Sequence, residues 1–464
     1  MRSTLKLHTA SIVLIILLQC VHFVCSIRAK TQPNKCGLTC NFPSNDSCRL
    51  DCSGRDLYDI DEEIKVSANV ETIAFNDNKL ESLSSKYFPK GNRFILLDFS
   101  HNNLKTIEDG AFKACNYTHI LLLCHNALWD LQIDEFEGLS NLEQLDLSYN
   151  RISLWFSETF RPLQSLSQLN LAHNTITSLE SESFEHLPLL EKLDLDNNEL
   201  VTLPAGVFEK NPRLKYLSLK GNLFTTVPNM GLRSARSLID LDLSSTHITQ
   251  ITKADFKGLS SIETLRITRI NSLLGIKRLA FSDMTKLKAF YCNNNYNLRR
   301  IDQNAFIDTS TNQPLSLNEI YLRNTAISSL SKNLLPWDQL KTVDLGGNRW
   351  KCDCNLQWLR NLTLINGKSE MKCEKPWRLS GRNLFELQVD DFSCSFLDNV
   401  DSDIIGICML IIVICMVIVV VAFVFVKLAI CRKLIKRKQN CGDYIRVFPK
   451  KDRIDLEWDT SAEP

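Results

Sequence analysis

The chain has almost no net charge and no recognisable catalytic motif. Its 54 lysines and arginines nearly balance its 53 aspartates and glutamates, which gives a formal charge of +1. A protein whose main partner is nucleic acid usually carries a clear basic excess, so this balance argues against that role. The sequence also lacks a GxxxxGK[ST] phosphate loop, and no Ser/His/Asp, paired-carboxylate or metal-ligand grouping stands out in it. We therefore expect neither an enzyme nor a bound cofactor or metal.

A 24-residue period dominates the middle of the chain. Apolar pairs flank an asparagine that recurs at this step, at Asn78, Asn102, Asn126, Asn150, Asn174, Asn198 and Asn222. A phenylalanine column keeps the same step at Phe112, Phe136, Phe160, Phe184, Phe208 and Phe256, with Leu232 in its place once. The pattern LxxLxLxxNxL at a fixed period of this length identifies leucine-rich repeats.

These repeats predict an α/β leucine-rich repeat solenoid over residues 70–347, with about twelve turns. Each repeat supplies a short strand whose two leucines point inward, and stacked strands form a curved parallel sheet on the concave face. The phenylalanines should fill the core under the convex side. Because an asparagine amide both donates and accepts, a buried column of asparagines can satisfy backbone groups that the turns leave unpaired.

The later repeats are less regular. The asparagine column continues as Thr246, Ile270, Asn295, Thr325 and Asn348, and the interval before Thr325 is the longest. That interval contains the polar stretch 307–316, which we interpret as a loop. Such a loop on a rigid scaffold often carries recognition, and the alternative is a tolerated insertion without a role.

Outward strand positions suggest a protein-binding surface on the concave face. The column between the paired leucines is acidic early and aromatic later, and its candidate ligand-binding residues are Asp194, Asp242, Arg266, Tyr291 and Tyr321. Tyrosine with scattered charge is typical of protein interfaces, whereas the aspartates can also be ordinary repeat consensus. A second column holds His101, His125 and His173, which either sense pH or are consensus filler.

The first residues have the pattern of a signal peptide, predicted at 1–26. Arg2 and Lys6 precede an apolar run, and small residues follow it. The predicted cap at 27–69 contains a cluster of four cysteines, Cys36, Cys40, Cys48 and Cys52. In an exported chain such a cluster is expected to form disulfides and not a zinc site. Four cysteines allow three pairings, and spacing does not choose among them.

A second cysteine group follows the last repeat at 348–395, in the segment NRWKCDCNLQWL and beyond it: Cys352, Cys354, Cys373 and Cys394. This C-x-C opening resembles the carboxy-terminal cap of extracellular leucine-rich repeat proteins. The resemblance implies the disulfides Cys352–Cys373 and Cys354–Cys394. The first cysteine cluster resembles that family's amino-terminal cap, which implies Cys36–Cys48 and Cys40–Cys52.

A membrane-spanning helix is predicted at 404–426, after a linker at 396–403. Its uncharged run at about 1.5 Å per residue exceeds a hydrocarbon core of roughly 30 Å. Basic residues follow the run, and positive charge inside places the repeats outside the cell. In the predicted cytoplasmic tail at 427–464, Tyr444 and Val447 form a possible sorting or phosphotyrosine motif, and Cys431 and Cys441 are palmitoylation candidates.

Three N-x-[ST] motifs predict N-linked glycans at Asn45, Asn116 and Asn361. A glycan on Asn116 should project from the convex or lateral surface.

From cap to tail, the plan resembles the ectodomains of Toll-like receptors and Slit-like proteins, without an intracellular signalling domain. The resemblance implies a single-pass type I receptor or adhesion protein of the plasma membrane that binds an extracellular or cell-surface protein. The alternative is a co-receptor or decoy that modulates Toll-like or other receptors, by lateral association or as a dimer.

Overall fold

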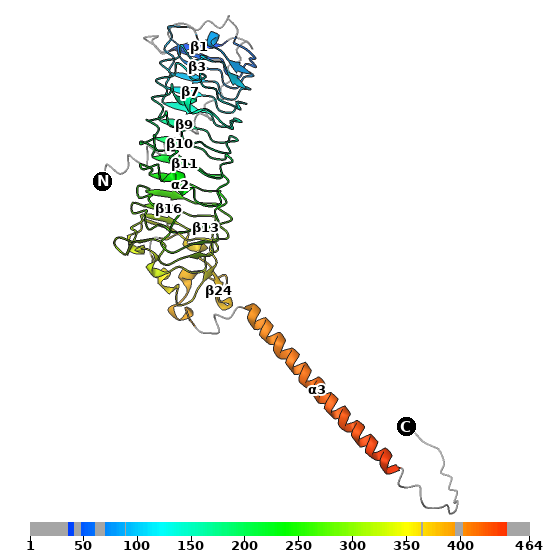
Figure 1. The fold of residues 1–464 in the computed structure, drawn as a ribbon. Helices are drawn as coiled ribbons and strands as arrows, with labels where there is room; N and C mark the ends of the chain where they lie inside the picture. Colours follow the sequence, from blue (N-terminus) through cyan, green and yellow to red (C-terminus); the bar gives the residue numbers. More distant parts are fainter. Residues whose placement is uncertain are drawn as a thin grey trace, which may run out of the picture. The chain divides into compact units, whose positions relative to one another are not determined.

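The computed structural model describes residues 36–40, 48–60, 70–88, 90–362, 365–394 and 402–442. The chain divides into two units, Met1–Phe392 and Ser393–Pro464. The first is a solenoid of stacked short strands (Figure 1). The predicted signal peptide lies outside the described residues, as do Asn45, Tyr444 and Val447.

One sheet runs the length of the solenoid. Its strands, in spatial order, are β1 (Gly37–Cys40), β2 (Cys48–Asp51), β3 (Val70–Ala74), β5 (Leu96–Asp98), β7 (Ile120–Leu122), β8 (Gln144–Asp146), β9 (Gln168–Asn170), β10 (Lys192–Asp194), β11 (Tyr216–Ser218), β12 (Asp240–Asp242), β14 (Thr264–Arg266), β16 (Ala289–Tyr291), β20 (Glu319–Tyr321), β21 (Thr342–Asp344) and β23 (Ile365–Asn366). β1 and β2 are antiparallel, and each later strand pairs in parallel with its neighbour. The predicted parallel-sheet solenoid is confirmed.

The register of the sheet follows the sequence period. Leu145 pairs with Leu169, which pairs in turn with Leu193, so equivalent residues of successive repeats lie side by side. The central residue of each such strand is buried and its two neighbours are half-buried or exposed. We call the surface formed by these outward neighbours the sheet face.

A ladder of buried asparagines holds successive turns together. The amide nitrogen of Asn174 donates to the carbonyls of Leu147 and Leu171, at 3.0 Å each. Its oxygen accepts from the backbone N–H of Ile152 at 2.9 Å. Each asparagine therefore joins its own turn to the preceding one and satisfies backbone groups that water cannot reach. The predicted ladder is confirmed.

The side of the solenoid away from the sheet is filled by aromatic and aliphatic side chains. The phenylalanines of the predicted column are at most 1% exposed. Phe136 stacks on Phe160 with ring centroids 6.2 Å apart, and Phe184 stacks on Phe208 at 6.0 Å. Minor elements of the solenoid are β4 (Ser82–Leu83), β6 (Thr106–Ile107), β13 (Gln250–Ile251), β15 (Gly275–Ile276), β17 (Arg300–Ile301), α2 (Asn229–Leu232), η1 (Ser85–Tyr87), η2 (Ser157–Phe160), η3 (Lys332–Leu334) and η4 (Trp337–Gln339).

The insertion at 307–316, which its composition predicts to be a loop, contains two short paired strands. It forms a small antiparallel hairpin of β18 (Ile307–Asp308) and β19 (Gln313–Pro314). The carboxylate of Asp308 accepts from the backbone N–H and the hydroxyl of Ser310, at 2.7 Å each. Asn312 adopts a left-handed φ of 55°, which lets the chain reverse. These local bonds close the turn.

The implied amino-terminal pairing is wrong, because the structure joins Cys36 to Cys52. In the antiparallel register of β1 and β2, Gly37 lies opposite Asp51 and Cys40 opposite Cys48. The same register brings Cys36 beside Cys52 at the open end of the hairpin, with 4.4 Å between their Cα atoms. Cys48 is also disulfide-bonded.

The carboxy-terminal cap covers the last repeat. The disulfide between Cys352 and Cys373 is present, and Cys354 and Cys394 are also disulfide-bonded. Trp350 is fully buried. The elements of the cap are β22 (Trp350–Lys351), β24 (Cys373–Lys375), η5 (Gln357–Asn361), η6 (Lys368–Glu370), η7 (Trp377–Leu379), η8 (Leu384–Glu386) and η9 (Val389–Asp391).

In the second unit, the described residues from Ser402 onward form one long helix, α3 (Ser402–Gly442). Among the described residues, one stretch is long and apolar enough to cross a membrane, Met409–Lys433 with a mean hydropathy of 3.6. It overlaps the predicted span 404–426. Cys431 is exposed on this helix, and the side chain of Cys441 lies outside the described residues.

Candidate functional site on the sheet face

The acidic column of the sheet face is engaged with the backbone. The carboxylate of Asp194 accepts from the N–H of Asp196 at 3.0 Å, and that of Asp242 accepts from the N–H of Ser244 at 2.8 Å. Asp98 and Asp146 make the same bond to the residue two positions on. One oxygen of each aspartate therefore closes the turn that follows its strand.

Burial reduces the negative charge of this region at neutral pH. The pKa of Asp196 is raised to about 7, mainly because the carboxyl is buried and secondarily because of the charge on Asp194. Burial also raises the pKa of Asp194 and of Asp240 above the ordinary value. The Asp196 carboxyl, two residues after the column member Asp194, is therefore only partly charged at neutral pH.

The next strands along the sheet face carry a cluster of aromatic and charged side chains. Tyr291 and Tyr321 stack with ring centroids 4.6 Å apart and an interplanar angle of 8°. The guanidinium of Arg266 lies 5.2 Å from the centroid of Tyr291 and forms an ion pair with Asp240. Both tyrosine hydroxyls donate to Glu319, at 3.2 and 3.3 Å. Three predicted candidates, Arg266, Tyr291 and Tyr321, are thus brought together. With Asp240 and Glu319 they form what we call the tyrosine cluster.

The stacked rings of Tyr291 and Tyr321 are fixed by contacts within the chain. Burial and the neighbouring Glu319 carboxylate raise the pKa of Tyr291 to about 12, and burial raises the pKa of Tyr321. Both hydroxyls therefore stay protonated at physiological pH and remain hydrogen-bond donors. Side chains fixed in this way lose little conformational freedom on binding, which favours affinity.

Arg323 extends the cluster toward the carboxy-terminal cap, and the sequence reasoning missed it. Its Nε donates to Asp344 at 2.9 Å, and its Nη1 pairs with Glu370 of the cap. A Cβ on Gly346 would lie 3.0 Å from this guanidinium, and one on Gly367 only 2.3 Å from it. The two glycines therefore leave room for Arg323. The sequence feature that could have identified Arg323 is its outward position, two residues after Tyr321.

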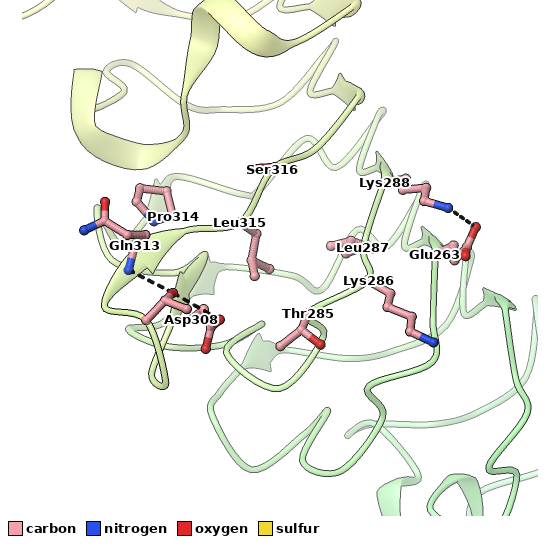
Figure 2. A pocket seen from close by; sticks show the side chains of 11 residues that line it. Glu263, Thr285, Lys286, Leu287, Lys288, Asp308, Gln313, Pro314, Leu315 and Ser316 are labelled. Atoms are coloured by element: carbon pink, nitrogen blue, oxygen red, sulfur yellow. Dashed lines mark hydrogen bonds and ion pairs between the residues drawn. The ribbon is translucent and has the colours of Figure 1, made fainter.

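A pocket of about 670 Å³ opens beside the cluster, between the β18–β19 hairpin and the strand starts of two repeats. Figure 2 shows Leu287 and Leu315 between the hairpin and the ion pair of Lys288 with Glu263, whose Nζ and Oε2 are 2.7 Å apart. Glu263 and Lys288 directly precede β14 and β16. The irregular insertion thus builds a cavity at the edge of the sheet face, next to the tyrosine cluster.

The histidine column forms a continuous stack next to the acidic half of the sheet face. Ring centroids are 4.2 Å apart for His101 and His125, 4.1 Å for His125 and Tyr149, and 4.0 Å for Tyr149 and His173. Each of these residues has a φ between 54° and 56°. Burial lowers the pKa of His173.

Other predicted residues lie apart from the cluster. Asn116 and Asn361 are exposed and separate from the sheet strands. Cys124 is half-buried, and burial raises its thiol pKa to about 12, so it is a poor nucleophile. Within the described ranges, no group of three or more His, Cys, Asp or Glu could hold a metal ion.

Sequence comparisons agree with the repeat architecture. The family model described as "Leucine rich repeat" matches residues 116–176, 164–224, 188–235 and 212–271. Chondroadherin of Homo sapiens is 32% identical over 104 residues, which are 22% of this chain and 27% of that protein. Trophoblast glycoprotein of Macaca fascicularis is 25% identical over 166 residues, 35% of this chain and 33% of that protein. The match thus spans about a quarter of the length of the first relative and a third of the second.

Solved structures share the fold. A chain of the mouse RP105/MD-1 complex superposes with a TM-score of 0.59 at 23% identity, over 71% of this chain and 55% of that chain. A chain of the glycosylated Drosophila Toll–Spatzle complex superposes with a TM-score of 0.54 at 21% identity, over 69% and 48% respectively. At these identities the likeness describes the fold alone.

Proposed function

Because the chain is a leucine-rich repeat protein, we propose that it is a single-pass receptor or adhesion protein of the plasma membrane. Its solenoid lies outside the cell and binds a protein partner through the tyrosine cluster. The membrane assignment is supported by the apolar stretch Met409–Lys433, whose end carries Lys427, Arg432 and Lys433. Basic residues after a span favour the cytoplasmic side.

The stacked tyrosines carry the proposal for binding. Tyrosine and arginine are enriched among the residues that dominate protein interfaces, and they act best when neighbours hold them in place. Tyr291, Tyr321 and Arg266 are all half-buried and fixed by Asp240 and Glu319. The strands from β12 to β21 are five neighbours, which at about 4.8 Å spacing give a patch roughly 20 Å long. The pocket at the β18–β19 hairpin adds further surface at the edge of this patch.

Two fold neighbours are known in complexes with proteins, RP105 with MD-1 and Toll with Spatzle. Chondroadherin and trophoblast glycoprotein share the repeats over a fraction of their length. These comparisons favour a protein ligand over a small molecule for the present chain.

A cell-clustering assay tests the proposal. Non-adherent cells expressing the full chain are mixed with parental cells, and we expect clusters among expressing cells or between the two populations. The double variant Tyr291→Ala/Tyr321→Ala should abolish clustering, because each tyrosine at the centre of an interface contributes about 2 kcal/mol, or roughly 30-fold in affinity. Tyr296→Ala is the matched control, since Tyr296 is 59% exposed and lies outside the sheet strands.

Two results would count against this reading. Clustering that survives the double variant at equal surface expression contradicts binding through the cluster. Absence of clustering in the wild type contradicts adhesion and favours the second reading, a co-receptor that associates laterally on one cell.

A further inference from the structure

A second, smaller pocket lies where the last repeat meets the carboxy-terminal cap. It has a volume of about 360 Å³ and is lined by residues of the η3–η4 segment and of η5. That volume falls within the range of about 300–1,000 Å³ typical of small-ligand sites. We call it the cap pocket.

The lining of the cap pocket suits a sugar. Trp337 and Trp358 both line it, with ring centroids 5.0 Å apart. Exposed polar side chains complete the lining, namely Lys332, Asn333 and Asp338. A sugar ring has apolar C–H faces that pack on indoles and hydroxyls that bond to amides, carboxylates and ammonium groups, so it matches both parts of this lining.

One indole of the cap pocket is fixed by a hydrogen bond. The Nε1–H of Trp358 donates to the carbonyl of Leu330 at 3.3 Å, and its ring packs against Trp337, which is only 5% exposed. Trp358 therefore offers a pre-positioned apolar wall to a sugar ring.

The cap pocket also contains its own attachment point for carbohydrate. Asn361 lines it and is the acceptor of the motif Asn361-Leu362-Thr363. We propose that the N-linked glycan of Asn361 packs its first N-acetylglucosamine into the cap pocket, against Trp358. The glycan then shields the junction of repeat and cap. This inference rests on the extracellular location of the solenoid under the proposed function.

The glycan is added by the secretory pathway and not by this chain. Transfer forms a bond between the amide nitrogen of Asn361 and C1 of the first sugar. It breaks the bond from that carbon to the diphosphate of the lipid-linked donor, and the amide proton leaves with the diphosphate product.

Asn116 offers a matched comparison within the same molecule. It is exposed and lines neither pocket described above. Thr118 of the same motif is buried, and its hydroxyl donates to the carbonyl of Phe94 at 3.0 Å. A glycan on Asn116 therefore starts from an open surface.

The test uses the full chain from eukaryotic cells. Mass spectrometry first measures occupancy at both asparagines, and native chain is then treated with a peptide N-glycosidase that removes whole glycans. We expect release from Asn361 to be at least about tenfold slower than from Asn116, because a tenfold protection needs only about 1.4 kcal/mol of packing. After denaturation the two rates should be equal.

Two variants connect the protection to the cap pocket. Trp358→Ala should bring release from Asn361 to the rate of Asn116 while leaving Asn116 unchanged. Asp338→Ala changes only an exposed lining residue, so it avoids any folding defect of the first variant, and it should speed release from Asn361 several-fold. In addition, Asn361→Gln should lower the thermal midpoint of the chain, whereas Asn116→Gln should leave it unchanged.

Equal native rates at the two sites would overturn the inference, as would an unoccupied Asn361 beside an occupied Asn116. Either result would leave the proposed function intact, because a glycan on Asn116 or Asn361 shows that the solenoid has entered the secretory pathway. A chain that carries no glycan and stays inside the cell would instead overturn the proposed function itself.

Discussion

Replacing one buried ladder asparagine tests how the solenoid is held together. Asn174→Ala leaves the N–H of Ile152 unpaired and removes one of the two amide donors from each of the carbonyls of Leu147 and Leu171, which keep their bonds from Asn150 and Asn198. Asn174 is 7% exposed, so water cannot easily replace the lost bonds. A buried polar group left unsatisfied costs about 1–3 kcal/mol. One such group, together with two lost hydrogen bonds of about 1 kcal/mol each, predicts a loss of about 3 kcal/mol or more in the free energy of unfolding.

Two measurements check this loss on the detergent-solubilised full chain. Denaturant unfolding gives the change in free energy, and hydrogen exchange of the Ile152 amide reports local opening of the ladder. Asn103→Ala is the control, because Asn103 is exposed and makes only a 3.4 Å bond to Glu81, so we expect a change within about 0.5 kcal/mol. A loss below about 1 kcal/mol for Asn174→Ala, with unchanged exchange at Ile152, would refute the structural role of the ladder.

Three further predictions concern buried groups of the solenoid. Burial raises the pKa of Glu135 to about 8, so between pH 4.5 and 8 the folded chain holds a proton that the unfolded chain releases. The free energy of unfolding should therefore decrease as pH rises through this range, and Glu135→Gln should weaken this pH dependence in denaturation measured from pH 5 to 9. Burial lowers the pKa of His173, so stability should fall as pH drops below its ordinary value of 6.5, and His173→Asn should lose this dependence in thermal melts between pH 7 and 5. Cys352→Ser opens a disulfide that spans 21 residues and should destabilise the carboxy-terminal cap by about 3 kcal/mol, seen as faster hydrogen exchange at Cys373 and its neighbours. Unchanged pH slopes or unchanged exchange would contradict the respective prediction.

Features that repeat with the 24-residue period were predictable from the sequence. A residue such as Asn174 or Phe160 recurs in phase with its column, and stacking then places every member of a column in the same environment. The buried ladder, the phenylalanine core and the parallel register all follow from this rule. They depend on backbone geometry that successive repeats share.

Features that depend on single side chains were not predictable in the same way. The cysteine pairing of the amino-terminal cap follows from the hairpin register that places Cys36 beside Cys52, and spacing does not reveal that register. The carboxylate of Asp194 bonds to the backbone beyond its strand, a direction that the column position leaves open. Glu319 and Arg323 belong to neighbouring outward columns, so tracking one column alone misses them.

The most direct test of the account is photo-crosslinking at the tyrosine cluster on living cells. A photoreactive phenylalanine analogue replaces Tyr321 in one variant of the full chain and the exposed Tyr296 in the other, and both are irradiated on cells that cluster in the assay above. The account predicts a discrete protein adduct from position 321 and none from position 296. An adduct from position 296 alone, or none from position 321 on cells that still cluster, would contradict recognition through this surface.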